Sequence, residues 1–267
     1  MDISDVLKDA DAVLDAFYPG QFGATAIAGK GIQSLARFLA GVLLQSTTDI
    51  CLPVHDKCSC ELNRVETLFG EVNPSGKLPY TYYKAGYTDH ISMNDFSCAK
   101  PPGRGYRYLP ADSEHILLPA FHGMSYTSFK VRVATAPLVL RNQPATNSLE
   151  LEVSVANTGS LAGSETILAF FRPQNRTNPG GMDLLPLQRR LCGLAKTEIL
   201  PAKGMVTVRV SITVDSLAMA DATGALVSMP GKYSIIISTG TKGAEEINIP
   251  LTIQGERLVM EELPPGI

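Results

Sequence analysis

The chain has 267 residues, of which 45% are hydrophobic and 18% charged, and its formal net charge is -3. This composition is typical of a packed globular protein and argues against wholesale disorder. Acidic and basic residues are interspersed without a basic run. That pattern argues against a nucleic-acid partner or an anionic membrane surface, because both bind clustered Lys and Arg.

The first part of the chain mixes strand and helix signals. Residues 12–18 form an apolar run closed by Pro19 and Gly20, which predicts a buried strand. Residues 23–28 have helix-forming character, so strand, glycine turn and helix indicate the start of an α/β unit. The glycine spacing matches neither a dinucleotide site nor a P-loop. We therefore predict no cofactor.

The next stretch, residues 29–66, carries an apolar run and a group of cysteines. Thiolates and imidazole are the usual ligands of zinc, and the group consists of Cys51, His55, Cys58 and Cys60. Its spacing fits no common structural zinc pattern, so we predict no metal site. The apolar run at 32–44 has too little polar interruption for a free surface helix and needs a partner surface.

After this stretch the chain alternates turns, one strand and a long loop. Residues 73–79 are a turn-forming cluster, and residues 80–83 predict a strand. A loop is expected from Lys84 to about Arg107, and Tyr106 and Tyr108 are expected to pack beneath it.

The second half reads as strands. Apolar and polar residues alternate strictly along 149–155, 206–214, 232–238 and 247–253, which places one face of each strand in a core and the other in water. Strands separated by Gly, Pro and Asn turns predict an antiparallel sandwich over residues 129–253. The Cys and Trp hallmarks of antibody domains are absent, which favours a fibronectin type III-like sandwich. Residues 254–267 are expected to be a loose tail.

Four sequence stretches carry a family resemblance by their order and spacing. They read YPGQFGATAIA at 18–28, LFGEVNPSGKLP at 68–79, PGRGYRY at 102–108 and PAFHGMSYTSF at 119–129. Together they resemble the family 3 glycoside hydrolases, which include β-xylosidases and β-glucosidases. The resemblance implies that residues 1–128 are the end of an α/β sandwich domain, and that a fibronectin III-like module follows.

The resemblance also implies that the chain lacks the catalytic residues. In this family a (β/α)8 barrel, which typically needs about 250 residues, supplies the nucleophilic Asp. The acid/base Glu also belongs to a segment upstream of the one that opens this chain. A retaining glycosidase needs two carboxyl groups about 5 Å apart, and Glu71, Asp89 and Asp95 are expected to be solvated turn acids. We therefore predict no catalytic residue in this C-terminal fragment.

The function implied by the resemblance belongs to a longer parent. That parent would hydrolyse O-glycosyl bonds of a carbohydrate substrate such as xylan or β-glucan. The sequon at Asn175 suits a secreted parent, whereas the start of this chain has no signal-peptide pattern. One alternative is a non-catalytic binding or docking sandwich, which exposed aromatic side chains gathered on one face would favour. Another is assembly with a separate chain that carries the barrel.

The stretch at 29–66 interrupts the family pattern, in which Ala28 would lead almost directly into the motif at 67–70. A translated intron explains this, because Gly29 and Lys30 can be encoded by GGTAAG, which contains a common intron start. Spliced transcripts that join Ala28 to Thr67 would support the hypothesis, and continuous transcript coverage would contradict it.

The remaining polar residues have structural interpretations. His122 stands where the family has Tyr or Asp and is expected to be a polar residue of a connecting loop. Arg104 and Arg107 are expected to tie the loop to a backbone carbonyl or an acidic neighbour. The five cysteines cannot all pair, and Cys98 and Cys192 are expected to be free and half-buried.

Overall fold

The computed structural model of the protein describes residues 67, 69–92, 94–134, 138–143, 148–174, 185–221 and 223–262. The predicted strand at 12–18, the helix at 23–28 and the cysteine group at 51–60 lie outside these residues. One compact unit spans Ser75–Ile267, and a second spans Asp2–Pro74. The described part is rich in β-strands and has few, short helices.

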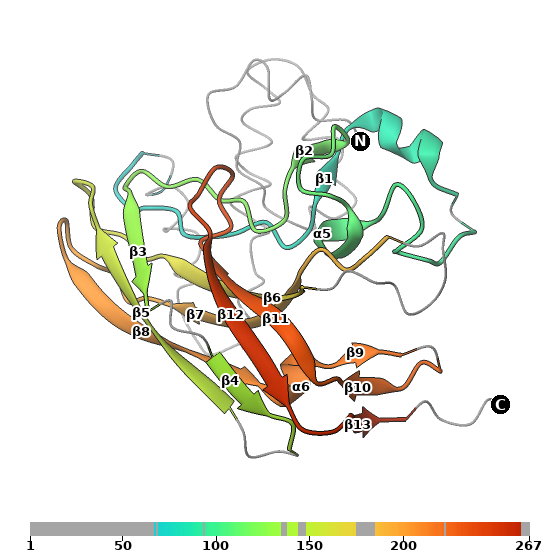
Figure 1. The fold of residues 1–267 in the computed structure, drawn as a ribbon. Coiled ribbons are helices and arrows are strands. Elements are labelled where there is room, and N and C mark those ends of the chain that lie inside the picture. Colours follow the sequence, from blue (N-terminus) through green and yellow to red (C-terminus); the bar gives the residue numbers. More distant parts are fainter. Residues whose placement is uncertain are drawn as a thin grey trace, which may run out of the picture. The chain divides into compact units, whose positions relative to one another are not determined.

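Two sheets form the centre of the compact unit that begins at Ser75 (Figure 1). The larger has the order β4(Leu138–Arg141), β12(Ile247–Gln254), β11(Gly231–Ser238), β6(Thr166–Pro173) and β7(Arg190–Lys196). The smaller has the order β3(Phe129–Val133), β5(Ser148–Asn157) and β8(Met205–Thr213). Neighbouring strands are antiparallel except β4 and β12, which are parallel.

The predicted alternation is confirmed in β5, β8 and β12. In β5, Val153 and Val155 are fully buried, whereas Glu150 and Glu152 between the apolar positions are exposed. The inward side chains of both sheets share one apolar core. The two sheets therefore bury one face each, as period-two strands require.

β6 and β11 depart from that alternation because both of their faces are buried. Ile235, Ile236 and Ile237 of β11 are all fully buried. On the outer face, Ile236 forms a second cluster with Leu168 and Phe170, and this cluster is covered by Tyr106, Phe121 and Leu191. The prediction that one face of residues 232–238 meets water is therefore wrong, because the preceding segment packs on that face.

This covering segment, residues 75–128, contains four short elements, which are β1(Tyr82–Tyr83), η1(Ala85–His90), α5(Gly105–Tyr108) and β2(Ile116–Leu118). The strand expected at 80–83 is confirmed only for its last two residues, which pair with β2. The expected loop at 84–107 contains η1 and α5, two turns of helix that its Gly and Pro content did not indicate.

Two tyrosines hold that loop in place. The rings of Tyr83 and Tyr87 stack with centroids 3.9 Å apart. The Tyr83 hydroxyl accepts a hydrogen bond from the Gly105 amide at 2.7 Å, and the Tyr87 hydroxyl donates to the Gly103 carbonyl at 2.5 Å. The two phenol groups therefore bind residues 103–105, near the end of the loop, to β1 and to η1.

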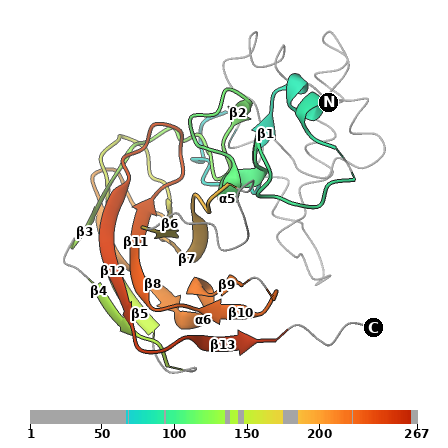
Figure 2. The same ribbon diagram turned by 45° about the vertical axis from the view of Figure 1, so that its right-hand side comes forward.

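The region expected to be a loose tail contains a strand at residues 258–261. β13(Leu258–Glu261) pairs with β10(Leu226–Ser228), which also pairs with β9(Met219–Ala220) (Figure 2). Residues 258–261 of the expected loose tail are therefore strand. The physical reason is that Leu258 and Met260 pack against the main core.

The strand expected at 206–214 ends one residue early. Val214 begins the short helix α6(Val214–Leu217), and the Thr213 side chain accepts a hydrogen bond from the Ser216 amide at 3.3 Å. A threonine at this position satisfies an otherwise unpaired amide of the first helical turn.

Candidate functional site

Glu165 and Lys77 form the most buried charged group in the part of the chain that the structure describes. Among the described residues, Glu165 is the only charged residue that is buried. Its Oε1 lies 2.9 Å from Nζ of Lys77, and the two side chains are 8% and 11% exposed. Glu165 directly precedes β6, whereas Lys77 belongs to the turn cluster that precedes β1.

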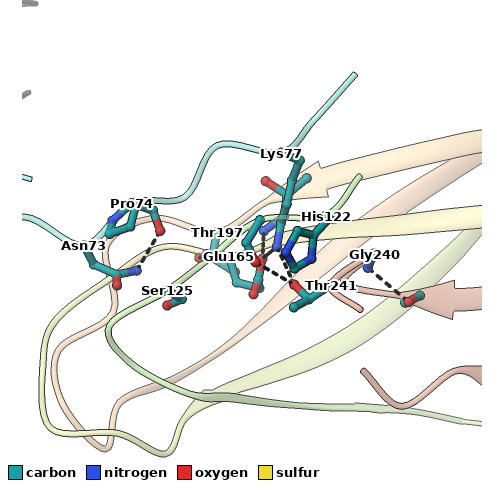
Figure 3. A network of polar contacts seen from close by, with 12 residues as sticks. Asn73, Pro74, Lys77, His122, Ser125, Glu165, Thr197, Gly240 and Thr241 are labelled. Carbon is teal, nitrogen blue, oxygen red and sulfur yellow. Dashed lines mark hydrogen bonds and ion pairs between the residues drawn. The ribbon is translucent and has the colours of Figure 1, made fainter. Parts of the chain in front are cut away.

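Neighbouring residues make further hydrogen bonds to the two members of this ion pair (Figure 3). Lys77 Nζ also donates to Oγ1 of Thr241 at 3.1 Å. Glu165 Oε1 also accepts from the Thr166 amide at 2.8 Å, and the Glu165 amide donates to Oγ1 of Thr197 at 3.0 Å. A carboxylate held by an ammonium group and an amide is an internal anchor, and no second carboxylate contacts it in these interactions.

His122 adjoins this ion pair. Its Nδ1 accepts a hydrogen bond from the Lys242 amide at 3.2 Å, and its carbonyl accepts from the Leu78 amide at 2.9 Å. Burial lowers the pKa of His122, and the charges of Lys77 and Lys242 lower it further. His122 lies in a loop, as expected, and joins the segment before the sandwich to the loop between β11 and β12.

The three turn acids have the environments of exposed or ion-paired carboxylates. Glu71 and Asp89 are exposed, as expected of solvated acids. Asp95 is half-buried and forms an ion pair with Lys100 at 3.1 Å. The Ser97 amide, followed by Lys100, holds the pKa of Asp95 below its usual value. A low pKa keeps the carboxylate charged, which is the wrong state for a general acid at neutral pH.

The loop residues between Arg104 and Tyr108 have structural contacts. Arg104 Nη2 donates to the Ser92 carbonyl at 3.0 Å, which confirms that this arginine ties the loop to a backbone carbonyl. The Arg107 side chain is exposed. Tyr106 packs edge-on against Phe121, with ring centroids 4.8 Å apart, so the expected packing of Tyr106 beneath the loop is confirmed.

Two hollows among the described residues lack the features of a glycosidase site. One is a cavity of about 40 Å³ whose polar lining includes Thr81, Tyr106, Arg172, Gln188 and Arg189. The other is a shallow hollow of about 330 Å³ over Arg141, Asn142, Gln143, Gln254 and Gly255. Ligand pockets typically enclose about 300–1,000 Å³. The cavity is too small, and neither lining contains a carboxylate.

The cysteines and acidic residues suggest no metal or redox chemistry within the described ranges. Cys98 and Cys192 are free, as expected, but neither is half-buried, because Cys98 is exposed and Cys192 is buried. Burial raises the pKa of Cys192 to about 12. No group of three or more His, Cys, Asp or Glu residues is placed to hold a metal ion in the described part.

Among the described residues, exposed aromatic side chains do not gather on the sandwich strands. Phe69, Tyr80, Phe96 and Tyr126 are the aromatic residues among the exposed large hydrophobics, and all precede β3. Of the described helices, none has the length and hydropathy needed to cross a membrane.

Sequence reasoning missed Lys77 and Glu165. The only local signal was a charged residue separated by one threonine from the apolar run 167–171. No local pattern links that residue to a lysine in a distant turn.

Comparison with known proteins places these features in a wider context. No family model matches the chain. A xylan 1,4-β-xylosidase of Xylanibacter ruminicola is 29% identical over 249 residues, which covers 92% of this chain and 22% of that protein. An exo-1,4-β-xylosidase of Emericella nidulans is 27% identical over 212 residues, which covers 74% of this chain and 26% of that protein. The chain therefore spans about a quarter of the length of these curated relatives.

Solved structures show the same relation. A GH3 exo-β-xylosidase in complex with a xylobiose aziridine probe matches with a TM-score of 0.65 at 20% identity, over 78% of this chain and 28% of that one. A β-glucosidase from Paenibacillus barengoltzii matches with a TM-score of 0.57 at 25% identity, over 77% of this chain and 23% of that one. The chain is therefore similar, over most of its length, to a region that makes up about a quarter of β-xylosidases and β-glucosidases, and its described part shares the fold of that region in a GH3 enzyme.

Proposed function

We propose that this chain is the C-terminal portion of a family 3 glycoside hydrolase of the β-xylosidase or β-glucosidase type. The parent enzyme hydrolyses O-glycosyl bonds of a carbohydrate such as xylan or β-glucan. The observation that carries the proposal is the similarity to a xylan 1,4-β-xylosidase over 92% of the chain. The four sequence motifs support it independently, and the sequon at Asn175 supports a parent that acts outside the cell.

The sandwich of this chain is, in the same proposal, a fibronectin III-like module. Its support is the sheet order, with three strands in β3-β5-β8 and five in β4-β12-β11-β6-β7 around one core. Residues 1–128 then represent the end of the preceding α/β sandwich domain, with the stretch 29–66 inserted into it.

The proposal includes that this chain alone does not hydrolyse glycosides. Hydrolysis with retention needs two carboxyl groups about 5 Å apart. In the described part, the one buried carboxylate is paired with Lys77, and neither hollow is lined by an acid. The function of the parent then depends on residues that other parts of that protein contribute.

Purified chain should be assayed with aryl β-xyloside and aryl β-glucoside substrates, with a full-length related β-xylosidase as the positive control. The expected rate equals that of heat-denatured chain. A rate that disappears when one carboxylate of this chain is changed to its amide would overturn this part of the proposal.

A second candidate is a non-catalytic binding sandwich. Within the described residues, the four exposed aromatic side chains lie before β3 rather than on the sandwich strands, which does not favour this candidate. Incubation of the chain with insoluble xylan and cellulose should leave it in the supernatant. Retention by either polysaccharide would favour the binding function instead.

A further inference from the structure

His122 and its neighbours contact the loop between β11 and β12, and Figure 3 labels His122 beside Thr241 of that loop. The Phe121 amide donates to the Leu78 carbonyl at 2.6 Å and the Leu78 amide donates to the His122 carbonyl at 2.9 Å, so two stretches of the segment run side by side. Thr241 of the loop donates through Oγ1 to the Gly123 carbonyl at 3.3 Å. These contacts join the loop between β11 and β12 to the segment 76–123, and this joined arrangement is the closed state.

His122 contributes to this closure only when its ring is neutral. Its Nδ1 accepts the Lys242 amide proton at 3.2 Å. A protonated imidazole carries a hydrogen on both ring nitrogens and accepts nothing. Protonation would therefore replace a donor–acceptor contact by two donors that face each other.

The charges around the ring also oppose protonation. Lys77 approaches from the turn cluster, and Lys242 belongs to the loop itself. Glu165 is the acid of this cluster, and it is already engaged by Lys77 at 2.9 Å and by the Thr166 amide at 2.8 Å. A new positive charge at His122 would meet two cations and a carboxylate that already has partners.

The closure also covers apolar surface. Phe121, the neighbour of His122, packs against Phe170 with ring centroids 5.3 Å apart and belongs to the group that covers the outer cluster on β6 and β11. A Cβ atom on Gly240 would lie 2.6 Å from Cβ of Phe121, so this loop and Phe121 are in close contact. Opening at His122 would loosen the cover over Phe170.

We propose that His122 is a pH-sensitive latch, which holds the loop between β11 and β12 to the segment 76–123 while its imidazole is neutral and releases the loop when the imidazole is protonated. The direction of the pH dependence follows from the environment of the ring. The pKa of His122 is lowered in the closed state by burial and by the two lysines. The open state therefore binds the proton first, and closure is complete above the ordinary histidine pKa of about 6.5 and weakens as the pH falls below it.

The test is hydrogen exchange of two amides in the full chain at pH 7.5 and pH 5.0, corrected for intrinsic rates. They are the Lys242 amide, which donates from the loop to His122 Nδ1, and the Leu78 amide, which donates to the His122 carbonyl. The informative variant is His122→Asn, because the amide oxygen can accept from the Lys242 amide but does not titrate. The matched control is His115→Asn, which removes a histidine that lies near Tyr87 and His90.

In the unchanged chain and in the control, both amides are expected to lose protection as the pH falls. In His122→Asn their protection should be the same at both pH values. A pH-dependent loss that persists in His122→Asn would overturn the latch. An NMR titration of the His122 ring in the unchanged chain serves as a second test, and a pKa at or above the ordinary histidine value would also overturn it.

Discussion

At the scale of single residues, Lys77 and Glu165 form the least exposed of the ion pairs found among the described residues. Burial of two charges costs solvation free energy that their attraction offsets only when the geometry and the surrounding hydrogen bonds are good. Here one carboxylate oxygen is 2.9 Å from the ammonium group and 2.8 Å from the Thr166 amide. Such a pair fixes the position of the two segments that it joins more than it adds stability. Removal of either residue would leave the other charge buried without a partner.

The change Glu165→Gln should therefore destabilise the chain by about 3 kcal/mol, because the Lys77 ammonium group remains buried without its counter-charge. The midpoint and slope of urea unfolding measure this. Glu152→Gln is the matched control, since Glu152 pairs with Arg209 at 3.4 Å but is 65% exposed, and exposed pairs contribute less than about 0.5 kcal/mol. Equal effects of the two changes would contradict the structural role given to Glu165.

The two described cysteines should differ sharply in reactivity. The thiolate is the reactive form, and burial raises the pKa of Cys192 to about 12, whereas Cys98 is exposed. Brief treatment of the native chain with a maleimide at pH 7.5, followed by peptide mass spectrometry, should label Cys98 and leave Cys192 unmodified. Addition of denaturant should make both react. Labelling of Cys192 at the rate of Cys98 in native chain would mean that β7 opens readily.

At the scale of elements, β11 shows how a strand pattern can mislead. Period-two alternation assigns one face to the core and the other to water. In β11 the outer residue Ile236 is as fully buried as its inward neighbours Ile235 and Ile237. The cover comes from Tyr106, Phe121 and Leu191, which lie far from β11 in the sequence. The strand is therefore an internal layer at this position.

The change Ile236→Thr should thus cost about 2–3 kcal/mol, since it removes buried methyl groups and introduces a hydroxyl without a partner. Thermal unfolding followed by circular dichroism measures the loss. Ser234→Ala on the same face of β11 is the control, because Ser234 is only half-buried. If Ile236→Thr left the melting temperature unchanged, the outer face of β11 would be open to solvent.

At the scale of the whole molecule, the boundary of the compact unit lies before the sandwich begins. The unit starts at Ser75, whereas the strand pattern alone starts at about residue 129. Residues between these points supply Lys77 to the buried ion pair and Phe121 to the outer cluster. These residues therefore stabilise the sandwich through their contacts, although they precede its first strand.

A shortened chain of residues 75–267 should therefore fold and unfold in one cooperative transition. A chain of residues 129–267 should be markedly less stable, because it exposes Phe170 and Ile236 and leaves Glu165 without Lys77. Urea unfolding of both pieces, followed by fluorescence of their tyrosines, provides the comparison. Equal stability of the two pieces would show that the segment 75–128 contributes nothing to the fold of the strands.

The sequence by itself determined four strands of the main core, β5, β8, β11 and β12, and the similarity to a larger enzyme. Alternation in β5, β8 and β12 is a local property of the sequence. It therefore predicts the buried face of each strand without knowledge of the residues that pack on that face. Four short motifs were enough to indicate the β-xylosidases and β-glucosidases to which the chain proved similar.

Only the tertiary structure decided which residues share a site. The pairing of Lys77 with Glu165, the cover over Ile236 and the strand β13 all depend on contacts between residues that are remote in sequence. A local pattern reports which side chains prefer burial, but it carries no information about the partner that buries them. For that reason the outer face of β11 was assigned to water and residues 258–261 to a loose tail, whereas the folded chain gives both of them partners.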